Sequence, residues 1–450
     1  MFQKVLVANR GEIAVRIIRS CKQLGIDTVA VYSKADESSL HVHLADEAVC
    51  IGSHSANDSY LNMENIITAA IHTGAEAIHP GFGFLSEQTK FANLCEDVNI
   101  TFIGPTSKII EQMGDKAQAI KLMKEAGVPL VPGSNQEVDM ASGKEIAQKI
   151  GFPVLIKASA GGGGRGMRLV RNAGQFEDAY YAAKQEAQAA FGHDGVYVEK
   201  FIEQPRHVEV QILADKYQNV LHLGERDCSI QRRNQKVVEE APSSLNIDLR
   251  EKMYEAAIKA AKHVGYENAG TIEFIVKDNK FYFIEMNTRI QVEHPVSEMI
   301  TGIDIIKEQL QIASGKELSI KQEDIAFNGH AIEVRINAED PKYDFRPSPG
   351  LVKFFHMPQG LGIRMDTMLY TDYEIPPYYD AMVGKLIAHG KDRLEAIRNL
   401  RAALEELIIE GIPTNQYFLM MILMHNDFVH DRIDTAFIEK HIERLLAYET

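Results

Sequence analysis

Short apolar runs and amphipathic segments alternate along the first hundred residues. Apolar runs at residues 5–8 and 28–32 flank an amphipathic segment that follows Gly11. The same order of strand and helix repeats through residues 66–71, 77–79 and 101–104. Strands that alternate with helices are typical of a parallel α/β sheet. The pattern therefore predicts one doubly wound α/β domain over residues 1–113.

The rest of the chain reads as a small unit followed by a larger region. Two prolines and a glycine within residues 128–133 indicate a hinge. The small unit, residues 153–198, has predicted strands at 154–156, 167–170 and 196–198 and a helix at 176–190. The larger region has predicted strands at 208–213, 271–276 and 281–286 and helices at 394–409 and 415–424. We find no internal sequence repeat.

Composition narrows the class of protein. The chain has 450 residues, which suffices for two or three domains. Its net charge of -15 argues against nucleic-acid binding, because a phosphate backbone requires a basic surface. The 4 cysteines are widely spaced, which favours free thiols in a cytosolic protein. We expect neither a signal peptide at the N-terminus nor a membrane span, since the apolar run at residues 418–424 is too short.

A glycine tract precedes one of the predicted strands. Gly161, Gly163 and Gly166 form a GxGxxG pattern, but a strand follows it, whereas a dinucleotide-binding motif opens a helix. The tract therefore reads as a mobile hairpin loop whose backbone N–H groups could cover phosphates. Lys157, just before the tract, supplies a cation. This favours a phosphate-binding lid over the alternative, a flexible surface linker.

Two glutamates flank a predicted β-hairpin. If Asp278, Asn279 and Lys280 form a three-residue loop, counting outward places Glu273 opposite Glu285 on one face of the sheet. Like charges directly opposite each other are destabilising, so this pair requires a cation. Two carboxylates are what Mg²⁺ takes from protein while it keeps phosphate oxygens and waters as further ligands. The hairpin therefore predicts a magnesium site.

Polar residues continue from this pair with a period of two. If the chain stays extended, one face carries Glu285, Asn287, Arg289, Gln291 and Glu293 over about 26 Å, at roughly 3.3 Å per residue. The alternative is a solvated face of a half-buried strand. We favour a binding surface, because the row runs from acid through amide and arginine back to acid and continues a carboxylate pair that requires a metal.

Other candidates are cationic. Lys236, at the start of a predicted strand, is a candidate anion ligand, and Arg335 is either an ion-pair arginine or a second anion ligand. Arg232 and Arg233 read as solvated loop charges. The two histidines at positions 41 and 43 read as surface residues, because no acidic or cysteine partner is arrayed for a metal.

Five segments together resemble the biotin carboxylase family closely. They are residues 7–14, 79–87, 157–167, 225–233 and 283–295. The resemblance covers essentially the whole chain and implies an ATP-grasp fold. It implies a linker at 114–129, a mobile lid domain at 130–203 and a C-terminal domain at 204–450, of which the ATP-grasp part ends near residue 330.

The resemblance also implies a role for each matching residue. ATP would be bound by Lys116, Lys157, the backbone of Gly163 and Gly164, Glu199, Lys200, Ile202, His207, Glu273 and Glu285. Glu199, Lys200 and Ile202 would line the adenine pocket. Two Mg²⁺ or Mn²⁺ ions would be bound by Glu273, Glu285 and Asn287. Bicarbonate would be bound by Lys236, Arg289, Gln291 and the Val292 backbone.

Glu293 would be the base, and Arg335 would stabilise the biotin enolate. Bicarbonate must lose its second proton to become a good nucleophile, which is why a carboxylate base fits. Attack on the γ-phosphorus would give carboxyphosphate and ADP, and the water-sensitive intermediate explains a lid. One departure stands out: the family often has a histidine where this chain has Asn234, which puts a nucleotide contact in doubt.

The implied partners are a biotin carboxyl carrier protein, whose biotin is a substrate, and carboxyltransferase subunits. The chain is similar to a free-standing subunit of a bacterial acetyl-CoA carboxylase, which serves fatty acid synthesis, and a homodimer is implied. A pyruvate or other acyl-CoA carboxylase stays open as the parent complex. The alternatives are another ATP-grasp ligase, such as a carbamoyl-phosphate or purine-pathway enzyme, and a non-catalytic ATP-binding regulatory subunit.

Overall fold

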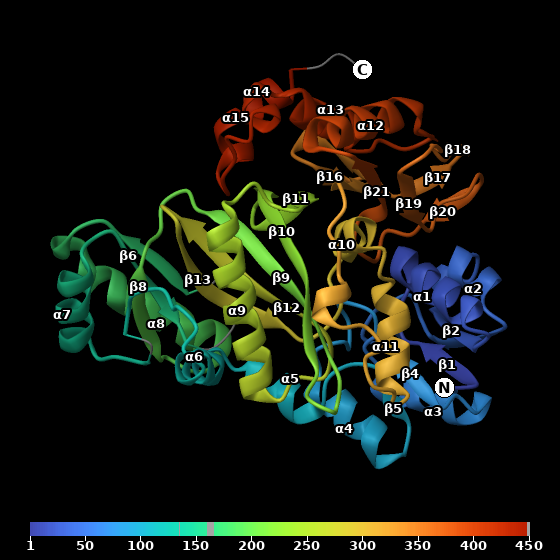
Figure 1. Cartoon of the computed structure of the whole chain (residues 1–450), viewed down its shortest axis with the longest axis horizontal. Helices are drawn as coiled ribbons and strands as arrows, with labels where there is room; N and C mark the ends of the chain where they lie inside the picture. The colour runs from blue at the N-terminus through green and yellow to red at the C-terminus, as the bar shows by residue number, and fades with distance from the viewer. Residues whose placement is uncertain (135, 160–165, 448–450) are drawn as a thin grey trace.

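Three main sheets form three successive parts of the chain (Figure 1). The structure, a computed structural model, describes residues 1–134, 136–159 and 166–447. Gly163 and Gly164, predicted to cover ATP phosphates, lie outside the described residues. The described part contains no helix long and apolar enough to cross a membrane.

The N-terminal part is a five-stranded parallel sheet in the order β3-β2-β1-β4-β5. Its strands are β1 (Lys4–Val7), β2 (Asp27–Ser33), β3 (Glu47–Gly52), β4 (Ala77–His79) and β5 (Thr101–Phe102). Its helices are α1 (Gly11–Gln23), α2 (Leu40–Leu44), α3 (Met63–Thr73), α4 (Thr89–Asp97) and α5 (Ser107–Gly114). Val5 and Leu6 are fully buried in separate clusters on the two faces of the sheet. The predicted doubly wound sheet is confirmed, because helices cover both faces.

The strand order of this sheet places a loop at the future site. Since β1 lies between β2 and β4, the chain leaves β1 where the winding changes direction, and such points form crevices at the carboxyl ends of strands. Asn9 follows β1 there. Its amide donates to the carbonyls of Pro80 and Phe82, both at 2.7 Å, and so joins the loops after β1 and β4.

The second part is a three-stranded antiparallel sheet in the order β7-β6-β8. Its elements are α7 (Met140–Ile150), β6 (Val154–Ala158), β7 (Met167–Val170), α8 (Phe176–Phe191) and β8 (Val196–Lys200). One face packs on the helices through Val154, Ile156 and Phe176, all fully buried. Because side chains alternate along a strand, Lys157 and Glu199 lie on the other face.

The third part is built on an eight-stranded antiparallel sheet in the order β13-β12-β9-β10-β11-β14-β21-β19. Its strands are β9 (Arg206–Ala214), β10 (Val220–Arg232), β11 (Gln235–Ala241), β12 (Asn268–Lys277), β13 (Lys280–Asn287), β14 (His330–Asn337), β19 (Ile363–Thr367) and β21 (Met382–Gly390). Helices α6 (Lys116–Glu125), α9 (Ile247–Val264), α10 (His294–Thr301), α11 (Ile305–Ala313) and α12 (Arg393–Glu406) pack on this sheet. Helix α6 occupies most of the segment that the resemblance implied to be a linker.

The two faces of β9 have different partners. Val208, Val210 and Ile212 pack on α6 and α9 in one apolar cluster. His207, Glu209 and Gln211 alternate with them and therefore face the other side, toward α10. This polar face of the sheet carries the candidate site.

Smaller elements complete the C-terminal end. They are β15 (Glu339–Asp340), β16 (Arg346–Pro347), β17 (Gly350–Val352), β18 (Phe354–His356), β20 (Tyr373–Ile375), β22 (Ile408–Glu410), α13 (Gln416–Met424), α14 (Asn426–Val429) and α15 (Phe437–Leu445). Leu386 of β21, Leu400 of α12 and Phe418 of α13 are fully buried in one cluster. This core supports β14 and β21 from behind.

The hairpin between β12 and β13 pairs Glu273 with Glu285, as predicted, but by another route. The loop has two residues, not three, since Lys277 pairs with Lys280. Asp278 and Asn279 both have positive φ, 51° and 57°, which a tight turn of this kind requires. An extra residue at Ile284 then shifts the register, because Phe274 pairs with Phe283 while Glu273 pairs with Glu285. The two errors in the prediction cancel.

The structure also corrects one histidine. His41, predicted at the surface, is 0% exposed, and its Nε2 lies 3.2 Å from the carbonyl of Val31. Burial is the main cause that lowers its pKa from 6.5 to about 4. His43, two residues further, is exposed as predicted.

Candidate functional site

Lys236 lies at the centre of the candidate site. Its Nζ lies 2.5 Å from Oε2 of Glu209, 2.9 Å from Oε1 of Glu273 and 2.6 Å from Oε1 of Glu293. Burial alone would lower the pKa of Lys236, but the three carboxylates outweigh burial and raise it well above its usual value. Lys236 is therefore a permanent cation, as a candidate anion ligand has to be.

The carboxylate pair across the hairpin has the properties of a metal site. Burial alone would raise the pKa of Glu273, but Lys236 and His207 outweigh it and hold that pKa well below its usual value. Burial and then the charge of Glu273 raise the pKa of Glu285. Asn287 donates to Glu273 over 2.9 Å and leaves its carbonyl oxygen toward Arg289. Two carboxylates and an amide oxygen fit Mg²⁺, whose charge would relieve the repulsion between the acids.

The polar row predicted from Glu285 to Glu293 is not extended throughout. Strand β13 ends at Asn287, and Glu293 is already the N-cap of α10 with φ -83° and ψ 13°. The intervening loop turns back, so Glu273 and Glu293 both reach Lys236. The expectation of one face about 26 Å long is therefore wrong, and the row folds around a compact site.

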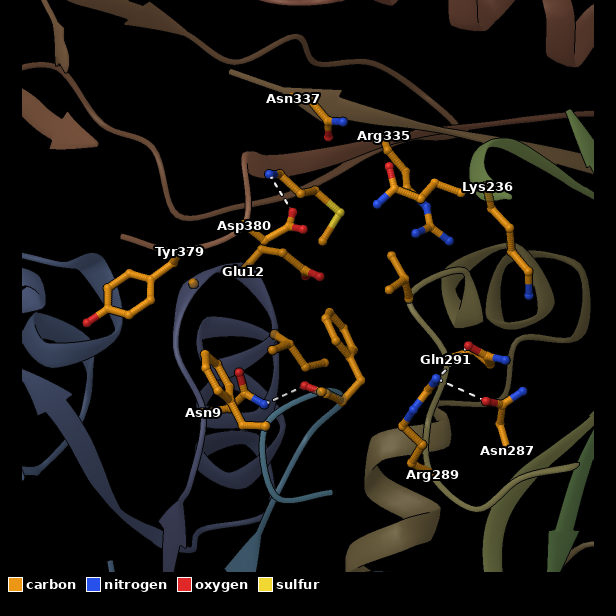
Figure 2. A pocket seen from close by; sticks show the side chains of 18 of the residues that line it. Asn9, Glu12, Lys236, Asn287, Arg289, Gln291, Arg335, Asn337, Tyr379 and Asp380 are labelled. Carbon is orange, nitrogen blue, oxygen red and sulfur yellow. Dashed lines mark hydrogen bonds between the residues drawn. The ribbon is translucent and has the colours of Figure 1, made fainter. Parts of the chain in front are cut away.

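Arg289 lies within this loop and joins its neighbours. Its guanidinium donates to Gln291 Oε1 at 2.8 Å and to Asn287 Oδ1 at 3.0 Å (Figure 2). Its Nε donates to Glu87 at 3.0 Å. Gln291 in turn donates to Glu273 over 2.9 Å. A fork of fixed N–H donors of this kind suits a small planar oxyanion.

Arg335 on β14 lies on the other side of Glu293. Its NH2 group lies 3.0 Å from Oε2 of Glu293, and its Nε donates to Glu239 at 2.6 Å. Burial alone would raise the pKa of Glu293, but Lys236 and Arg335 outweigh it and hold that pKa well below its usual value. Glu293 is therefore a buried carboxylate held between two cations.

Three charged residues of this network, Glu209, Arg226 and Glu239, were not predicted. Arg226, fully buried on β10, donates to Glu209 at 2.6 Å and to Gln211 at 2.7 Å. Glu239 has a pKa raised to about 7, chiefly by burial. Polar alternation along β9 is the signal that could have found Glu209. Its partner Arg226 and the neighbour Glu239 come from strands whose pairing the sequence does not reveal.

Two adjoining cavities meet at Glu285 and Asn287. The larger, of about 730 Å³, is lined by residues of the N-terminal part and of the eight-stranded sheet. Figure 2 shows Asn9 and Tyr379 on one side of it and Lys236 and Gln291 on the other. It therefore lies at the switch point of the parallel sheet.

The smaller cavity, of about 450 Å³, lies toward the second part of the chain. Lys116, Lys157 and Glu199 line it together with apolar residues of β13. Lys157 and Glu199 form an ion pair. This cavity combines an apolar wall with two lysines, as a nucleotide requires. Asn234, where the family often has a histidine, lines the larger cavity instead.

Two residues predicted for the adenine pocket, Lys200 and Ile202, do not line the smaller cavity. Lys200 donates from Nζ to the carbonyls of Gly151 and Phe152, at 3.0 and 3.1 Å. Ile202 is half-buried. In the part of the chain that the structure describes, neither Ile202 nor Lys200 lines the larger or the smaller cavity. The geometry therefore brings together Lys116, Lys157 and Glu199, but not these two.

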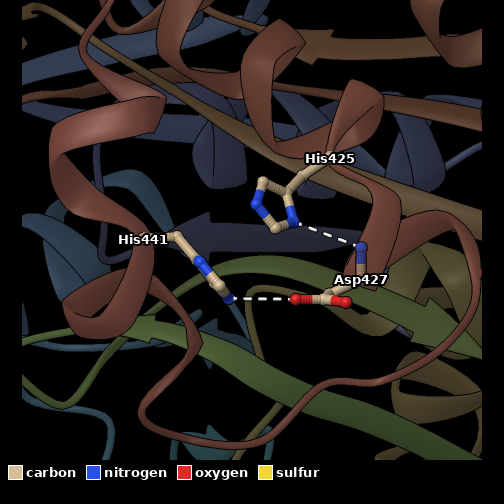
Figure 3. A group of neighbouring side chains, drawn as sticks. All are labelled: His425, Asp427 and His441. Carbon is tan, nitrogen blue, oxygen red and sulfur yellow. Dashed lines mark hydrogen bonds and ion pairs between the residues drawn. The ribbon is translucent and has the colours of Figure 1, made fainter.

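A second cluster of potential ligands lies at the C-terminal end (Figure 3). His441 pairs with Asp427 over 3.2 Å, and Arg432 lies on the other oxygen of that carboxylate. His425 accepts the N–H of Asp427 at Nδ1, over 3.2 Å, as the N-cap of α14. A neutral ring that accepts at Nδ1 carries its proton on Nε2. We therefore interpret this cluster as a helix cap.

Comparison with protein families covers nearly the whole chain. The model of the biotin carboxylase N-terminal domain matches residues 1–110, and that of the biotin carboxylase C-terminal domain matches 333–440. The ATP-binding domain of the carbamoyl-phosphate synthase L chain matches 115–321. The biotin carboxylase of Nostoc is 57% identical over 442 residues, 98% of this chain and 99% of that protein. The chain belongs to the biotin carboxylase family.

Other members of the biotin carboxylase family differ in context. A pyruvate carboxylase subunit of Methanothermobacter thermautotrophicus is 51% identical over 98% of this chain and 90% of that protein. A biotin carboxylase complex from Campylobacter jejuni has a TM-score of 0.93 at 48% identity, over 98% of this chain and 99% of that one. The biotin carboxylase domain dimer of Hydrogenobacter thermophilus 2-oxoglutarate carboxylase, solved with MgADP and bicarbonate, has a TM-score of 0.92 at 52% identity and full coverage of both chains. The predicted family and ATP-grasp fold are confirmed.

Proposed function

We propose that this chain carboxylates biotin on a separate carrier protein, using ATP and bicarbonate and releasing ADP and phosphate. One observation carries the proposal: the buried carboxylate of Glu293 lies between Lys236 and Arg335, both of which line the larger cavity. An acid held by one candidate anion ligand on each side is placed to take a proton from an anion bound there.

The smaller cavity is the proposed nucleotide site. Lys116 and Lys157 would neutralise phosphate oxygens, and the apolar wall beside Glu199 would receive the base. Glu273, Glu285 and Asn287 would hold two Mg²⁺ or Mn²⁺ ions, which neutralise charge on the transferred phosphoryl group. His207 lies 2.9 Å from Glu273 and would orient that carboxylate.

The loop after β13 is the proposed bicarbonate site. Lys236, Arg289, Gln291 and the Val292 backbone would hold the anion. Glu293 would remove its proton, so that an oxygen of the dianion attacks the γ-phosphorus, and the bond to the leaving ADP oxygen breaks. The product, carboxyphosphate, decomposes into CO₂ and phosphate. Burial of Glu293 keeps bulk water from competing for this step.

Arg335 is the proposed contact for biotin. Phosphate would take the ureido proton of biotin, and the guanidinium would stabilise the negative charge on the ureido oxygen while nitrogen attacks CO₂. Nε of Arg335 is held by Glu239 at 2.6 Å, which fixes the orientation of the planar group. The larger cavity provides the volume for the bicyclic ring beside it.

We further propose that the chain is the biotin carboxylase subunit of an acetyl-CoA carboxylase and works as a homodimer with carrier and carboxyltransferase subunits. A biotin carboxylase of Bacillus subtilis and a pyruvate carboxylase subunit have similar identity to this chain, 56% and 51%. Identity therefore does not distinguish acetyl-CoA from pyruvate as the final carboxyl acceptor, and an experiment has to. A pull-down from the source cell would identify the biotinylated carrier, and a carrier of pyruvate carboxylase would contradict this assignment.

Bicarbonate-dependent ATP hydrolysis with free biotin tests the core of the proposal. Biotin should stimulate ADP release only when bicarbonate is present, and acid-labile carboxybiotin should form. A carbamoyl-phosphate or purine-pathway ligase would instead need an ammonia source or another carboxylate. An absence of stimulation by biotin would refute the proposed reaction.

A further inference from the structure

A lysine outside the site described above touches the backbone of its central loop. Lys385 of β21 is 0% exposed, and its Nζ donates to the carbonyl oxygen of Val292 at 2.7 Å. Val292 directly precedes Glu293 and lines the larger cavity. A buried ammonium costs several kcal/mol unless it is paired, so its place beside this carbonyl requires compensating acids.

Those acids come from two parts of the chain. Oε1 of Glu12, in the first turn of α1, lies 3.2 Å from Nζ of Lys385. Asp366 of β19 is directly opposite Lys385 in the sheet, and Glu333 lies on the neighbouring strand β14. Glu12, Glu333 and Asp366 are buried. Lys385 therefore joins the N-terminal part, the eight-stranded sheet and the loop that carries Glu293.

The preceding carbonyl of the loop is held as well. Nδ1 of His294 lies 2.8 Å from the carbonyl oxygen of Gln291, so the ring donates there. In a trans peptide the N–H points opposite to the C=O, so the N–H of Val292 is turned away from His294. Within the described residues, no protein acceptor takes that N–H. The two carbonyl contacts thus fix the peptide planes on both sides of Val292 and leave one N–H donor for a ligand.

We propose that Lys385 is a positioning residue for bicarbonate: it holds the Val292 carbonyl and so fixes the peptide plane between Val292 and Glu293. His294 fixes the preceding plane, which carries the Val292 N–H, so the two contacts together set the direction of that N–H and of the Glu293 side chain. The inference rests on the proposed function, because it concerns the bicarbonate site of that reaction. Lys385 does not touch the substrate itself. Its loss should weaken bicarbonate binding and proton removal, and leave the nucleotide cavity, on the other side of Glu285, unchanged.

The test compares Michaelis constants for bicarbonate and for ATP. Lys385→Met should raise the KM for bicarbonate at least tenfold, while the KM for ATP stays within about twofold. Lys385→Arg, which keeps a donor for the carbonyl, should recover part of the loss. Lys391→Met, at an exposed lysine six positions along the chain, is the matched control and should change neither constant. Equal shifts in both constants, or an unchanged bicarbonate KM in folded Lys385→Met, would overturn the inference.

A double variant separates positioning from charge balance. Lys385→Met leaves Glu12 unpaired and should lower the melting temperature, since an isolated buried charge is destabilising. Adding Glu12→Gln removes that charge, so Lys385→Met with Glu12→Gln should regain melting temperature but keep the raised bicarbonate KM. Recovery of both would mean that the lysine only neutralises Glu12, and the inference would fail. If the unmodified protein showed no bicarbonate-dependent ATP hydrolysis, the proposed function would fail instead, whatever the variants did.

Discussion

Oε1 of Glu293 lies 2.6 Å from Nζ of Lys236, while its Oε2 lies 3.0 Å from Arg335, so each oxygen of this buried carboxylate has its own cation. The arrangement keeps Glu293 ionised and places it next to Lys236 and Arg335, which line the larger cavity. Because Lys236 and Arg335 cover both oxygens of Glu293, a proton donor has to bind at one of these two cations to reach the carboxylate. That selects an anion that still carries an acidic proton.

Replacement of the proposed base should stop the reaction without disturbing nucleotide binding. Glu293→Gln keeps the shape of the side chain and removes its basicity, so bicarbonate-dependent ATP hydrolysis should fall at least about 100-fold, the usual contribution of a general base. The dissociation constant of ATP, measured by calorimetry, should change less than about threefold. A variant that kept a tenth or more of the activity would refute the assigned base.

The carboxylate pair should control the requirement for magnesium. Glu285→Gln removes one of two anionic ligands, so the Mg²⁺ concentration for half-maximal ATP hydrolysis should rise about tenfold or more. Because burial and Glu273 raise the pKa of Glu285, protons compete with the metal, and the affinity of the unmodified protein for Mg²⁺ should fall as pH is lowered. That pH dependence should be weaker in Glu285→Gln. Glu255→Gln, at an exposed helix position, serves as control, and an equal shift there would argue against the site.

Arg335 should matter more for carboxybiotin than for ATP hydrolysis. In Arg335→Met the enolate loses its cationic partner, so carboxybiotin formation should fall at least about 100-fold, in the range seen when one oxyanion donor is removed. Bicarbonate-dependent ATP hydrolysis should fall less, because Lys236 still holds Glu293. The ratio of the two rates in one reaction mixture is the measurement. An unchanged ratio would place Arg335 in the first step rather than the second.

Buried His41 should make the N-terminal part sensitive to acid. Its pKa is lowered from 6.5 to about 4, chiefly by burial, so its contribution to stability is complete above pH 6.5 and is lost as pH falls toward 4. The full effect is roughly 3.5 kcal/mol, at about 1.4 kcal/mol per pKa unit. His41→Gln should therefore flatten the dependence of the unfolding free energy on pH between 6.5 and 4. Urea titrations at a series of pH values measure this slope, and identical slopes would count against the argument.

The sequence predictions that the structure confirms came from local patterns of strands, helices and turns. Alternation of strands and helices predicted the parallel sheet, and the hairpin predicted that Glu273 faces Glu285. The predicted row ending at Glu293 failed after Asn287, because alternation of polar residues cannot tell a strand from a loop that folds back under tertiary contacts. The acids around Lys236 were not predictable as a group.

The site residues that the sequence did not predict were missed for one physical reason. Glu209, Glu239 and Arg226 meet Lys236, Arg335 and each other only through the order of strands β9, β10, β11 and β14. That order depends on long-range pairing, which no local period encodes. The same holds for Lys385, whose apolar neighbours on β21 read as an ordinary buried strand.

The extra residue at Ile284 separates two properties of β13: the shape of the smaller cavity and the pairing of Glu285 with Glu273. Ile284 is 39% exposed and lines the smaller cavity, whereas Glu285, next to it, belongs to the proposed metal site. If Ile284 were deleted, regular pairing would still set Glu285 opposite Glu273, since Phe283 already pairs with Phe274. The surface of the smaller cavity, the proposed nucleotide site, would change, but the pairing of Glu273 with Glu285 would not. Substitutions at this single position can therefore reshape the wall of the proposed nucleotide site while the neighbouring carboxylate pair keeps its register.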